Sequence, residues 1–203
     1  MTVESLVDQI ARELARSEPR RAARGSYEIE AAVALLLRPA GSGLEFLAIK
    51  RSECEKDPWS GHMALPGGRR DLDDEDLWQT AVRETIEEVD VDLSKVGRLL
   101  GRLDDVAPRS RHIPAIVVTP FVVAVRESVD ARTSSEVEMA VWLPLDVVVS
   151  EEHRGTLRLD VLPDREFPTI EYGGHVIWGL TLNILRQLEG LLSRMGYGSG
   201  ARG

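Results

Sequence analysis

Three carboxylates recur at helical spacing near the middle of the chain. Glu84, Glu87 and Glu88 stand at positions i, i+3 and i+4, so a helix would project them from one face within about one turn. Like charges at this spacing destabilise a bare helix, and here they lie toward its C-terminal end, where the macrodipole disfavours negative charge. A divalent cation held between the carboxylates would offset both effects, and oxygen ligands favour Mg²⁺, Mn²⁺ or Ca²⁺ over zinc. A solvated acidic helix face would give the same pattern, so these residues alone do not decide.

A glycine-rich loop precedes the carboxylates. Pro66-Gly67-Gly68 lets the backbone pass close to a ligand, and glycine carbonyls can coordinate a metal ion. Arg83 and Arg98 are available to orient or neutralise neighbouring carboxylates. The loop and the helix together favour a metal site over a solvated acidic face.

The joint spacing of loop and helix resembles the Nudix box. That motif is a Gly, five residues, Glu, seven residues, Arg-Glu, an apolar residue, any residue, Glu-Glu, any residue, Gly and an apolar residue. In this chain Glu75 stands eight residues before Arg83, Arg83-Glu84 and Glu87-Glu88 match, and Val91 fills the closing apolar position. The resemblance implies a Nudix-type α/β/α sandwich with a mixed sheet, to which the helical spacing of Val3, Leu6, Ile10 and Leu14 adds an N-terminal helical extension.

The sequence departs from the box at three positions. Gly68 stands seven rather than six residues before Glu75, so the loop carries one extra residue. Thr85 takes an apolar position, and Asp90 replaces the second Gly. Because Asp tolerates a left-handed backbone better than most residues, we expect the helix to end at Asp90 all the same. None of the departures removes a carboxylate that the resemblance assigns to a metal.

Segments around the box are similar to the coenzyme A pyrophosphatase branch of the family. They are the extra loop residue, Arg51-Ser52, the stretch DPWSGHMALPGG over residues 57–68 and VIWGLT over residues 176–181, although Leu65 stands where that branch usually has Phe. The resemblance favours coenzyme A or a derivative as substrate without fixing it. ADP-ribose, a nucleotide sugar, a dinucleotide polyphosphate or a nucleoside triphosphate stays open. So does a nucleotide-sensing module without turnover, although such a sensor has no need of the box carboxylates.

The resemblance implies hydrolysis of a pyrophosphate bond with Mg²⁺ or Mn²⁺ as cofactor. A pyrophosphate offers only phosphorus flanked by anionic oxygens, so the catalyst must neutralise charge and aim a water molecule in line. The implied metal ligands are Glu84, Glu87, Glu88 and the Gly67 carbonyl. The implied catalytic residues are Glu84, Glu87, Arg83 and Glu136, with Glu138 as the substitute for Glu136. The candidate substrate-binding residues are Arg51, Trp59, His62 and Gly68.

Hydrophobic periodicity predicts an α/β chain around this segment. A first amphipathic helix ends by Pro19, and residues 155–175 are predicted to be irregular because they contain prolines and a Gly-Gly pair. Further helices are predicted over 75–89 and 178–195, a short helix after Pro144, and strands over 31–37, 44–50, 96–106, 115–125 and 137–143. The predicted organisation is an N-terminal helix and linker over 1–24, a Nudix domain over 25–195 and a flexible tail over 196–203.

Composition narrows the class of protein. The 203 residues carry a formal net charge of -9, which argues against a nucleic-acid partner because phosphate backbones repel an acidic chain. No run approaches the roughly 20 apolar residues of a membrane span, so no membrane partner is expected. The single cysteine, Cys54, permits no disulfide framework, and a cytoplasmic location is expected. A small nucleotide-containing substrate and a homodimer are the expected partners.

Overall fold

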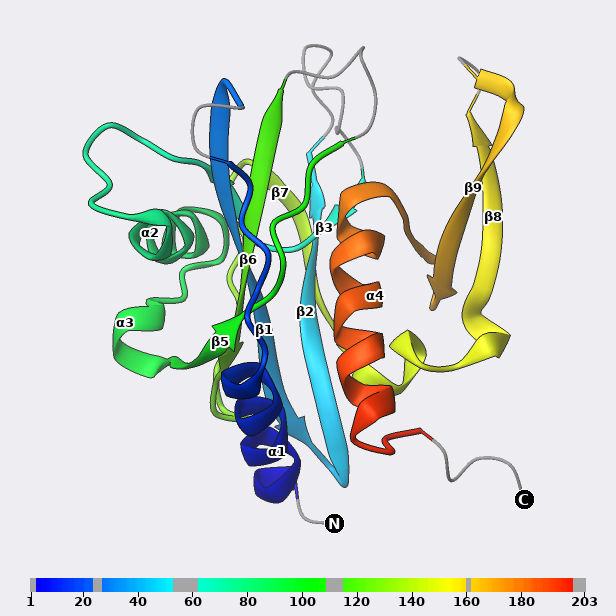
Figure 1. The fold of residues 1–203 in the computed structure, drawn as a ribbon, viewed down its shortest axis with the longest axis horizontal. Helices are drawn as coiled ribbons and strands as arrows, with labels where there is room; N and C mark the ends of the chain where they lie inside the picture. Colours follow the sequence, from blue (N-terminus) through cyan, green and yellow to red (C-terminus); the bar gives the residue numbers. More distant parts are fainter. Residues whose placement is uncertain (1–2, 24–26, 53–61, 109–114, 160–161, 199–203) are drawn as a thin grey trace.

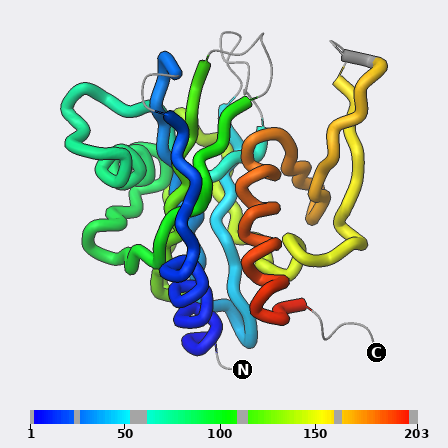
Figure 2. Tube along the Cα trace, viewed as in Figure 1, coloured from blue at the N-terminus to red at the C-terminus, as the bar shows by residue number. Residues whose placement is uncertain are grey.

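A computed structural model describes residues 3–23, 27–52, 62–108, 115–159 and 162–198. Figure 1 shows a central sheet with helices on both sides, and a second, smaller sheet beyond the C-terminal helix. The tube view in Figure 2 shows the N-terminal helix and the C-terminal helix on the same side of the central sheet. Among the described residues, no helix is long and apolar enough to cross a membrane.

The central sheet is mixed, as predicted. Within the described part of the chain it has seven strands, of which β3-β2-β1-β6-β5 form the main path, while β4 pairs with β1 and β7 with β2. The pairing of β1 with β6 is parallel, and the other pairings are antiparallel. The strands are β1 (Ile29–Ala40), β2 (Gly43–Arg51), β3 (Met63–Ala64), β4 (Gly67–Arg69), β5 (Arg98–Arg102), β6 (Ile116–Ala124) and β7 (Val137–Pro144). The predicted strand over 96–106 is therefore shorter than expected.

Helices cover both faces of this sheet, which confirms the predicted three-layer sandwich. Alternate residues of β1 point to opposite faces: Ala32 and Leu36 join the cluster under α2, whereas Leu35 and Leu37 join the cluster under α1 and α4. The apolar run of β1 is continuous because both faces are buried. The helices are α1 (Val3–Arg16), α2 (Leu77–Val89), α3 (Leu93–Val96) and α4 (Gly179–Arg194), with 3₁₀ turns η1 (Leu145–Val148) and η2 (Glu151–His153).

The prediction of irregular structure over 155–175 was wrong. This segment forms a three-stranded antiparallel sheet in the order β10-β9-β8, with β8 (Arg154–Leu159), β9 (Leu162–Tyr172) and β10 (His175–Ile177). Pro168 pairs with Thr156 of β8, while β10 pairs with residues 170–172. Since no described strand pairs with the other side of β9 at Pro168, the missing N–H breaks no ladder there. Gly173-Gly174, with φ of 58° and 81°, makes the tight turn between β9 and β10.

The ends of α2 follow from its sequence. Asp76 caps the N-terminus by accepting a hydrogen bond from the Gln79 N–H at 2.8 Å. Asp90 ends the helix in the left-handed conformation, with φ 57° and ψ 31°, so the expectation for the residue that replaces glycine is confirmed. Thr85 is fully buried and its hydroxyl donates to the Ala81 carbonyl at 2.7 Å. A polar residue is therefore tolerated at an apolar position of the box.

Helix α1 packs against β5 through a close approach to the backbone. Its buried side chains Leu6, Ile10 and Leu14 belong to the same apolar cluster as β1. At Gly101 of β5 a Cβ would lie 2.8 Å from the Leu14 Cβ. Only glycine allows Leu14 to lie this close to the strand, which bulges between Leu99 and Gly101.

We predict that Gly101→Ala lowers the free energy of unfolding by about 1–3 kcal/mol, because the added methyl overpacks the contact with Leu14. Urea unfolding checks this. Gly43→Ala is the matched control, because a Cβ at that position would meet no atom of the described residues within 4 Å, and it should leave stability unchanged or slightly raised. Equal stability of the two variants would contradict this packing.

Candidate functional site

The three box carboxylates lie on one face of α2 and differ in how deeply their side chains are buried. The exposed fraction of the side chain is 17% for Glu84, 56% for Glu87 and 4% for Glu88. Glu88 accepts a hydrogen bond from the Gly67 N–H at 2.8 Å, and its other oxygen lies 3.4 Å from an Arg51 nitrogen. The helix thus presents one buried and anchored carboxylate, Glu88, one partly buried carboxylate, Glu84, and one exposed carboxylate, Glu87.

The glycine pair places the loop directly against these carboxylates. Gly67 and Gly68 lie in β4, opposite Val33 and Ala32 of β1. A Cβ at Gly67 would lie 2.2 Å from the Ala32 carbonyl oxygen, and one at Gly68 would lie 2.5 Å from the Glu84 carboxyl group. Gly67 is therefore required for steric reasons, because the close atoms belong to the backbone of β1, whereas a side chain at Gly68 would displace the Glu84 carboxyl group.

Arg83 uses its whole guanidinium group to brace the carboxylate face. Its Nη1 donates to Glu84 at 2.9 Å and to Glu87 at 3.0 Å. Its Nε and Nη2 donate to the two oxygens of Asp74 at 3.1 and 3.0 Å, and Nη2 also donates to the Arg69 carbonyl at 2.9 Å. Arg83 therefore joins both glutamates to the buried Asp74 through hydrogen bonds.

Asp74, which the sequence analysis missed, is the acidic partner that holds Arg83. The box spacing pointed instead to Glu75, which is exposed. Asp74 is 5% exposed and also accepts from the Thr80 hydroxyl at 2.9 Å. Counted from Gly68, Asp74 stands at the position that the box gives to its first Glu. The extra residue therefore lies between the acid and Arg83, not between Gly68 and the acid.

The electrostatics of the face suit a bound cation. Burial, opposed by Arg83 and reinforced by Glu87 and Glu136, raises the pKa of Glu84 above its ordinary value. Burial also raises the pKa of Glu88 to about 7, although the Gly67 N–H and Arg51 act in the other direction. Mutual repulsion between carboxylates contributes to both shifts, and a divalent cation would relieve it.

The donor atoms fit a hard cation, but they are not converged on one point. Within the described ranges, no three His, Cys, Asp or Glu side chains are arranged to hold a metal ion. Glu84 and Glu87 each share a hydrogen bond with Arg83, and Glu88 is bonded to Gly67. Carboxylate oxygens are the ligands that Mg²⁺ and Mn²⁺ prefer, so the chemistry of the set agrees with the predicted cofactor.

Glu136 approaches the face from the loop before β7. Ser134 N–H donates to the Glu88 carbonyl at 3.1 Å, and Ser52 N–H donates to the Glu136 carbonyl at 3.0 Å. These bonds hold the loop beside the C-terminal half of α2, and the charge of Glu136 contributes to the raised pKa of Glu84. Glu138, the substitute, is instead ion-paired with Lys50 at 2.7 Å.

The other candidate residues differ in how close they lie to the carboxylates. His62 lies just before β3 and next to Arg51 of the neighbouring strand β2. The Arg51 N–H donates to the His62 carbonyl at 3.3 Å. Arg98, named as a possible partner of the carboxylates, pairs instead with Asp8 of α1 at 2.8 Å, so that expectation was wrong. Trp59 and Cys54 lie outside the described residues.

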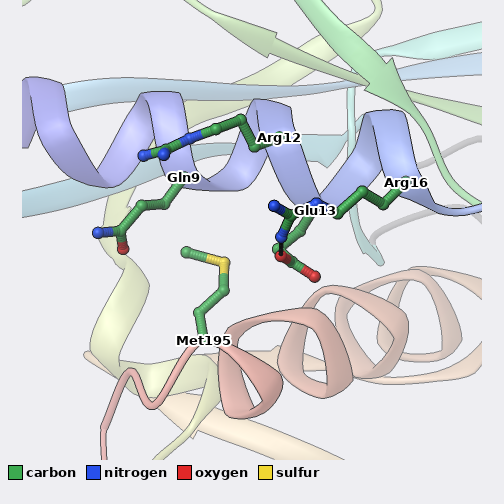
Figure 3. A pocket seen from close by; sticks show the side chains of 5 residues that line it. All are labelled: Gln9, Arg12, Glu13, Arg16 and Met195. Atoms are coloured by element: carbon green, nitrogen blue, oxygen red, sulfur yellow. Dashed lines mark hydrogen bonds and ion pairs between the residues drawn. The ribbon is translucent and has the colours of Figure 1, made fainter.

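A surface cavity of about 220 Å³ lies elsewhere, between α1 and the end of α4. Figure 3 shows the side chains that line it, with Arg16 paired to Glu13. These elements cover the face of the sheet opposite α2. The cavity is therefore separate from the carboxylate face.

We predict that Asp74→Asn lowers the free energy of unfolding at pH 7 by about 1–3 kcal/mol, because it weakens charged hydrogen bonds to Arg83. Hydrogen bonding to Arg83 lowers the pKa of Asp74 from 3.8 to about 2. A lowered pKa contributes stability that is complete above about pH 4 and is lost as the pH falls toward 2. The difference between wild type and variant in urea unfolding should therefore shrink across this window. Asp73→Asn, a change at an exposed neighbour, is the control, and a pH-independent difference would contradict the ion pair.

Comparison with known proteins agrees with this geometry. The NUDIX domain profile matches residues 28–163, about two thirds of the chain. A peroxisomal coenzyme A diphosphatase of Caenorhabditis elegans is 29% identical over 177 residues, which cover 82% of this chain and 72% of that protein. An uncharacterized protein of Schizosaccharomyces pombe is 40% identical over 118 residues, covering 56% of this chain but only 36% of its own length. The Nudix hydrolase NudL of Yersinia pestis is 32% identical over 132 residues, covering 64% of this chain and 63% of its own.

Solved structures share the fold at low sequence identity. An Ap4A hydrolase of C. elegans, solved as a binary complex, aligns with a TM-score of 0.52 and 19% identity over 82% of this chain and 98% of its own. The NUDIX domain of Shewanella oneidensis NrtR, solved with ADP ribose, aligns with a TM-score of 0.52 and 20% identity over 91% and 97%. With the match to the domain profile, the mixed sheet between helices and the Arg83-braced carboxylates, the chain belongs to the Nudix domain family.

Proposed function

We propose that this chain is a pyrophosphohydrolase that cleaves a pyrophosphate bond in a nucleoside-diphosphate-linked small molecule. The observation that carries the proposal is the face of α2, where Arg83 braces Glu84 and Glu87 beside the glycine loop. An acidic face with no catalytic use gains little from a partly buried arginine that is hydrogen-bonded to acids on both sides. A charge-neutralising site needs such fixed carboxylates.

The reaction is attack of water on one phosphorus atom of the anhydride. A P–O bond forms to the water oxygen, the bridging P–O bond breaks, and the bridging oxygen leaves on the second phosphate. The water proton passes to a carboxylate of the chain, for which Glu87 and Glu84 are the candidates. When bound, Mg²⁺ or Mn²⁺ supplies neutralisation of the phosphate oxygens and a lowered pKa of the attacking water.

The remaining roles follow from position. Glu84, Glu87, Glu88 and the Gly67 carbonyl would hold the cation, and Glu136 would add charge from the facing loop. Arg83 acts by orienting carboxylates, and Gly68 leaves open the space over Glu84. Arg51, 3.4 Å from Glu88, and its neighbour His62 would contact the anionic substrate.

Coenzyme A or a derivative is the substrate that we favour. The C. elegans relative, which carries the name of a coenzyme A diphosphatase, aligns over most of both chains. ADP-ribose, nucleotide sugars and nucleoside triphosphates belong in the same assay, because substrate contacts in this fold lie on loops outside the box. Incubation with Mg²⁺ or Mn²⁺ and identification of products by mass should show phosphopantetheine and adenosine bisphosphate from coenzyme A. Turnover of another compound alone would overturn the substrate and keep the reaction class.

We predict that Glu87→Gln lowers kcat by about 100- to 10,000-fold, because it removes a proton acceptor and a charge from the face. Glu75→Gln is the matched control: it changes a neighbouring exposed glutamate, whereas Arg83 is held by the adjacent Asp74. It should leave kcat within about threefold of the wild type on this reasoning. Steady-state rates with the best substrate, with and without EDTA, provide the test. An equal loss in both variants would mean that Glu75, not Asp74, holds Arg83.

A further inference from the structure

Three aromatic rings gather where the second sheet meets the start of α4. The His62 and Trp178 rings lie 4.8 Å apart between centroids, at 69°. The Phe167 and Trp178 rings lie 5.6 Å apart, at 62°. The Arg165 guanidinium carbon lies 5.1 Å from the centre of the Phe167 ring. We call His62, Phe167 and Trp178 the aromatic wall.

The fold brings His62 together with Phe167 and Trp178, which lie more than a hundred residues further along the chain. His62 immediately precedes β3, Phe167 lies in β9, and Trp178 joins β10 to α4. Figure 1 shows β3 close to the start of α4, with β9 on the far side of that helix. A ring set assembled in this way depends on the second sheet, which the Nudix box does not specify.

The wall adjoins the carboxylate face. The Arg51 N–H donates to the His62 carbonyl at 3.3 Å, and the Arg51 side chain lies 3.4 Å from Glu88. From Glu88 to Trp178 there are thus only two intervening residues, Arg51 and His62. These contacts connect the rings to the carboxylates along the paired strands β2 and β3.

The rings are more exposed than the apolar residues next to them in the chain. Ile177, which precedes Trp178, and Ile170, three residues after Phe167, are each 1% exposed. The three rings above are only partly buried, and Arg165 is exposed. Partly exposed aromatic rings beside an arginine are a surface on which a planar base stacks.

We propose that the aromatic wall, with Arg165 at its edge, binds the base of the nucleotide substrate by stacking. The inference rests on the proposed function for its location, and it names the part of the substrate that the wall recognises. Planar rings and a guanidinium plane favour a heteroaromatic base over a flexible aliphatic chain. The wall would therefore favour nucleotides over phosphorylated sugars that lack a base.

Two probes that contain no pyrophosphate bond test the wall without turnover. AMP carries adenine, and ribose 5-phosphate is the same fragment without it. In calorimetric titrations with Mg²⁺, the wild type should bind AMP at least fivefold more tightly. Phe167→Ala and Trp178→Leu should weaken AMP binding by about 5- to 20-fold and leave ribose 5-phosphate within twofold, while Trp178→Phe should keep most of the AMP affinity.

Tyr172→Ala is the matched control. Tyr172 is also a partly exposed ring of β9, but it packs edge-on against His153 at 5.1 Å instead of the wall. It should change neither affinity. Circular dichroism checks that each variant folds. If Trp178→Leu does not fold, the AMP affinity of Phe167→Ala, a change in β9, still tests the wall.

The outcomes separate the two proposals. Unchanged AMP affinity in the wall variants, equal loss of both probes, or equal wild-type affinity for the probes would overturn the wall. Base-dependent AMP binding without hydrolysis of any substrate by the wild type would overturn the proposed reaction and keep the wall. Hydrolysis of a substrate by the wild type, together with AMP affinities that the wall variants leave unaltered, would overturn the wall and keep the proposed reaction.

Discussion

The carboxylate face depends on one guanidinium group. Arg83 has five N–H donors, and each has an acceptor: two on Asp74, one each on Glu84 and Glu87, and the Arg69 carbonyl. The group therefore joins the loop, the buried Asp74, Glu84 and Glu87 in a single arrangement. Without it, the adjacent charges of α2 would repel each other with no fixed geometry. Asp74 supplies the anchor because it is almost fully buried and hydrogen-bonded on both oxygens.

The sheet fixes the position of this arrangement. Strand β1 pairs with β2, β4 and β6, so it holds the glycine loop of β4 on the rigid centre of the molecule. The same strand buries alternate residues under α2 and under α1 and α4. The Gly67 N–H then joins the strand to Glu88 at the buried end of the carboxylate face. Strand, loop and helix are thus coupled by short contacts, which suits a site that must keep charges in place.

Sequence patterns predicted the parts of the molecule that are governed by local periodicity. The continuous apolar run of β1, the amphipathic α2 and α4, and the left-handed end of α2 at Asp90 all follow from residue type and spacing. The order of strands and the second sheet did not, because they depend on contacts between distant segments. Pro168 and Gly173-Gly174 suggested irregular structure. Pro168, however, lies where β9 has a single described neighbour, and the two glycines form the turn between β9 and β10.

The site was predicted only as far as the motif extends. Glu84, Glu87 and Arg83 are close together because their spacing on a helix requires it. The segment DLDDED over 71–76 offers five acids among six residues. Spacing from Arg83 pointed to Glu75 as the acid of the box, whereas in the folded chain the buried acid is Asp74. The aromatic wall combines His62 with two residues more than a hundred positions away, and no periodicity in the sequence joins them.

The central claim is that the braced face of α2 binds a divalent cation. Electron paramagnetic resonance of free Mn²⁺ during titration of the wild type and of the Glu84→Gln/Glu87→Gln double variant tests it most directly. We expect saturable Mn²⁺ binding by the wild type and a loss of at least tenfold in affinity in a double variant that still folds. Equal binding by the two proteins, or none by the wild type, would contradict the account.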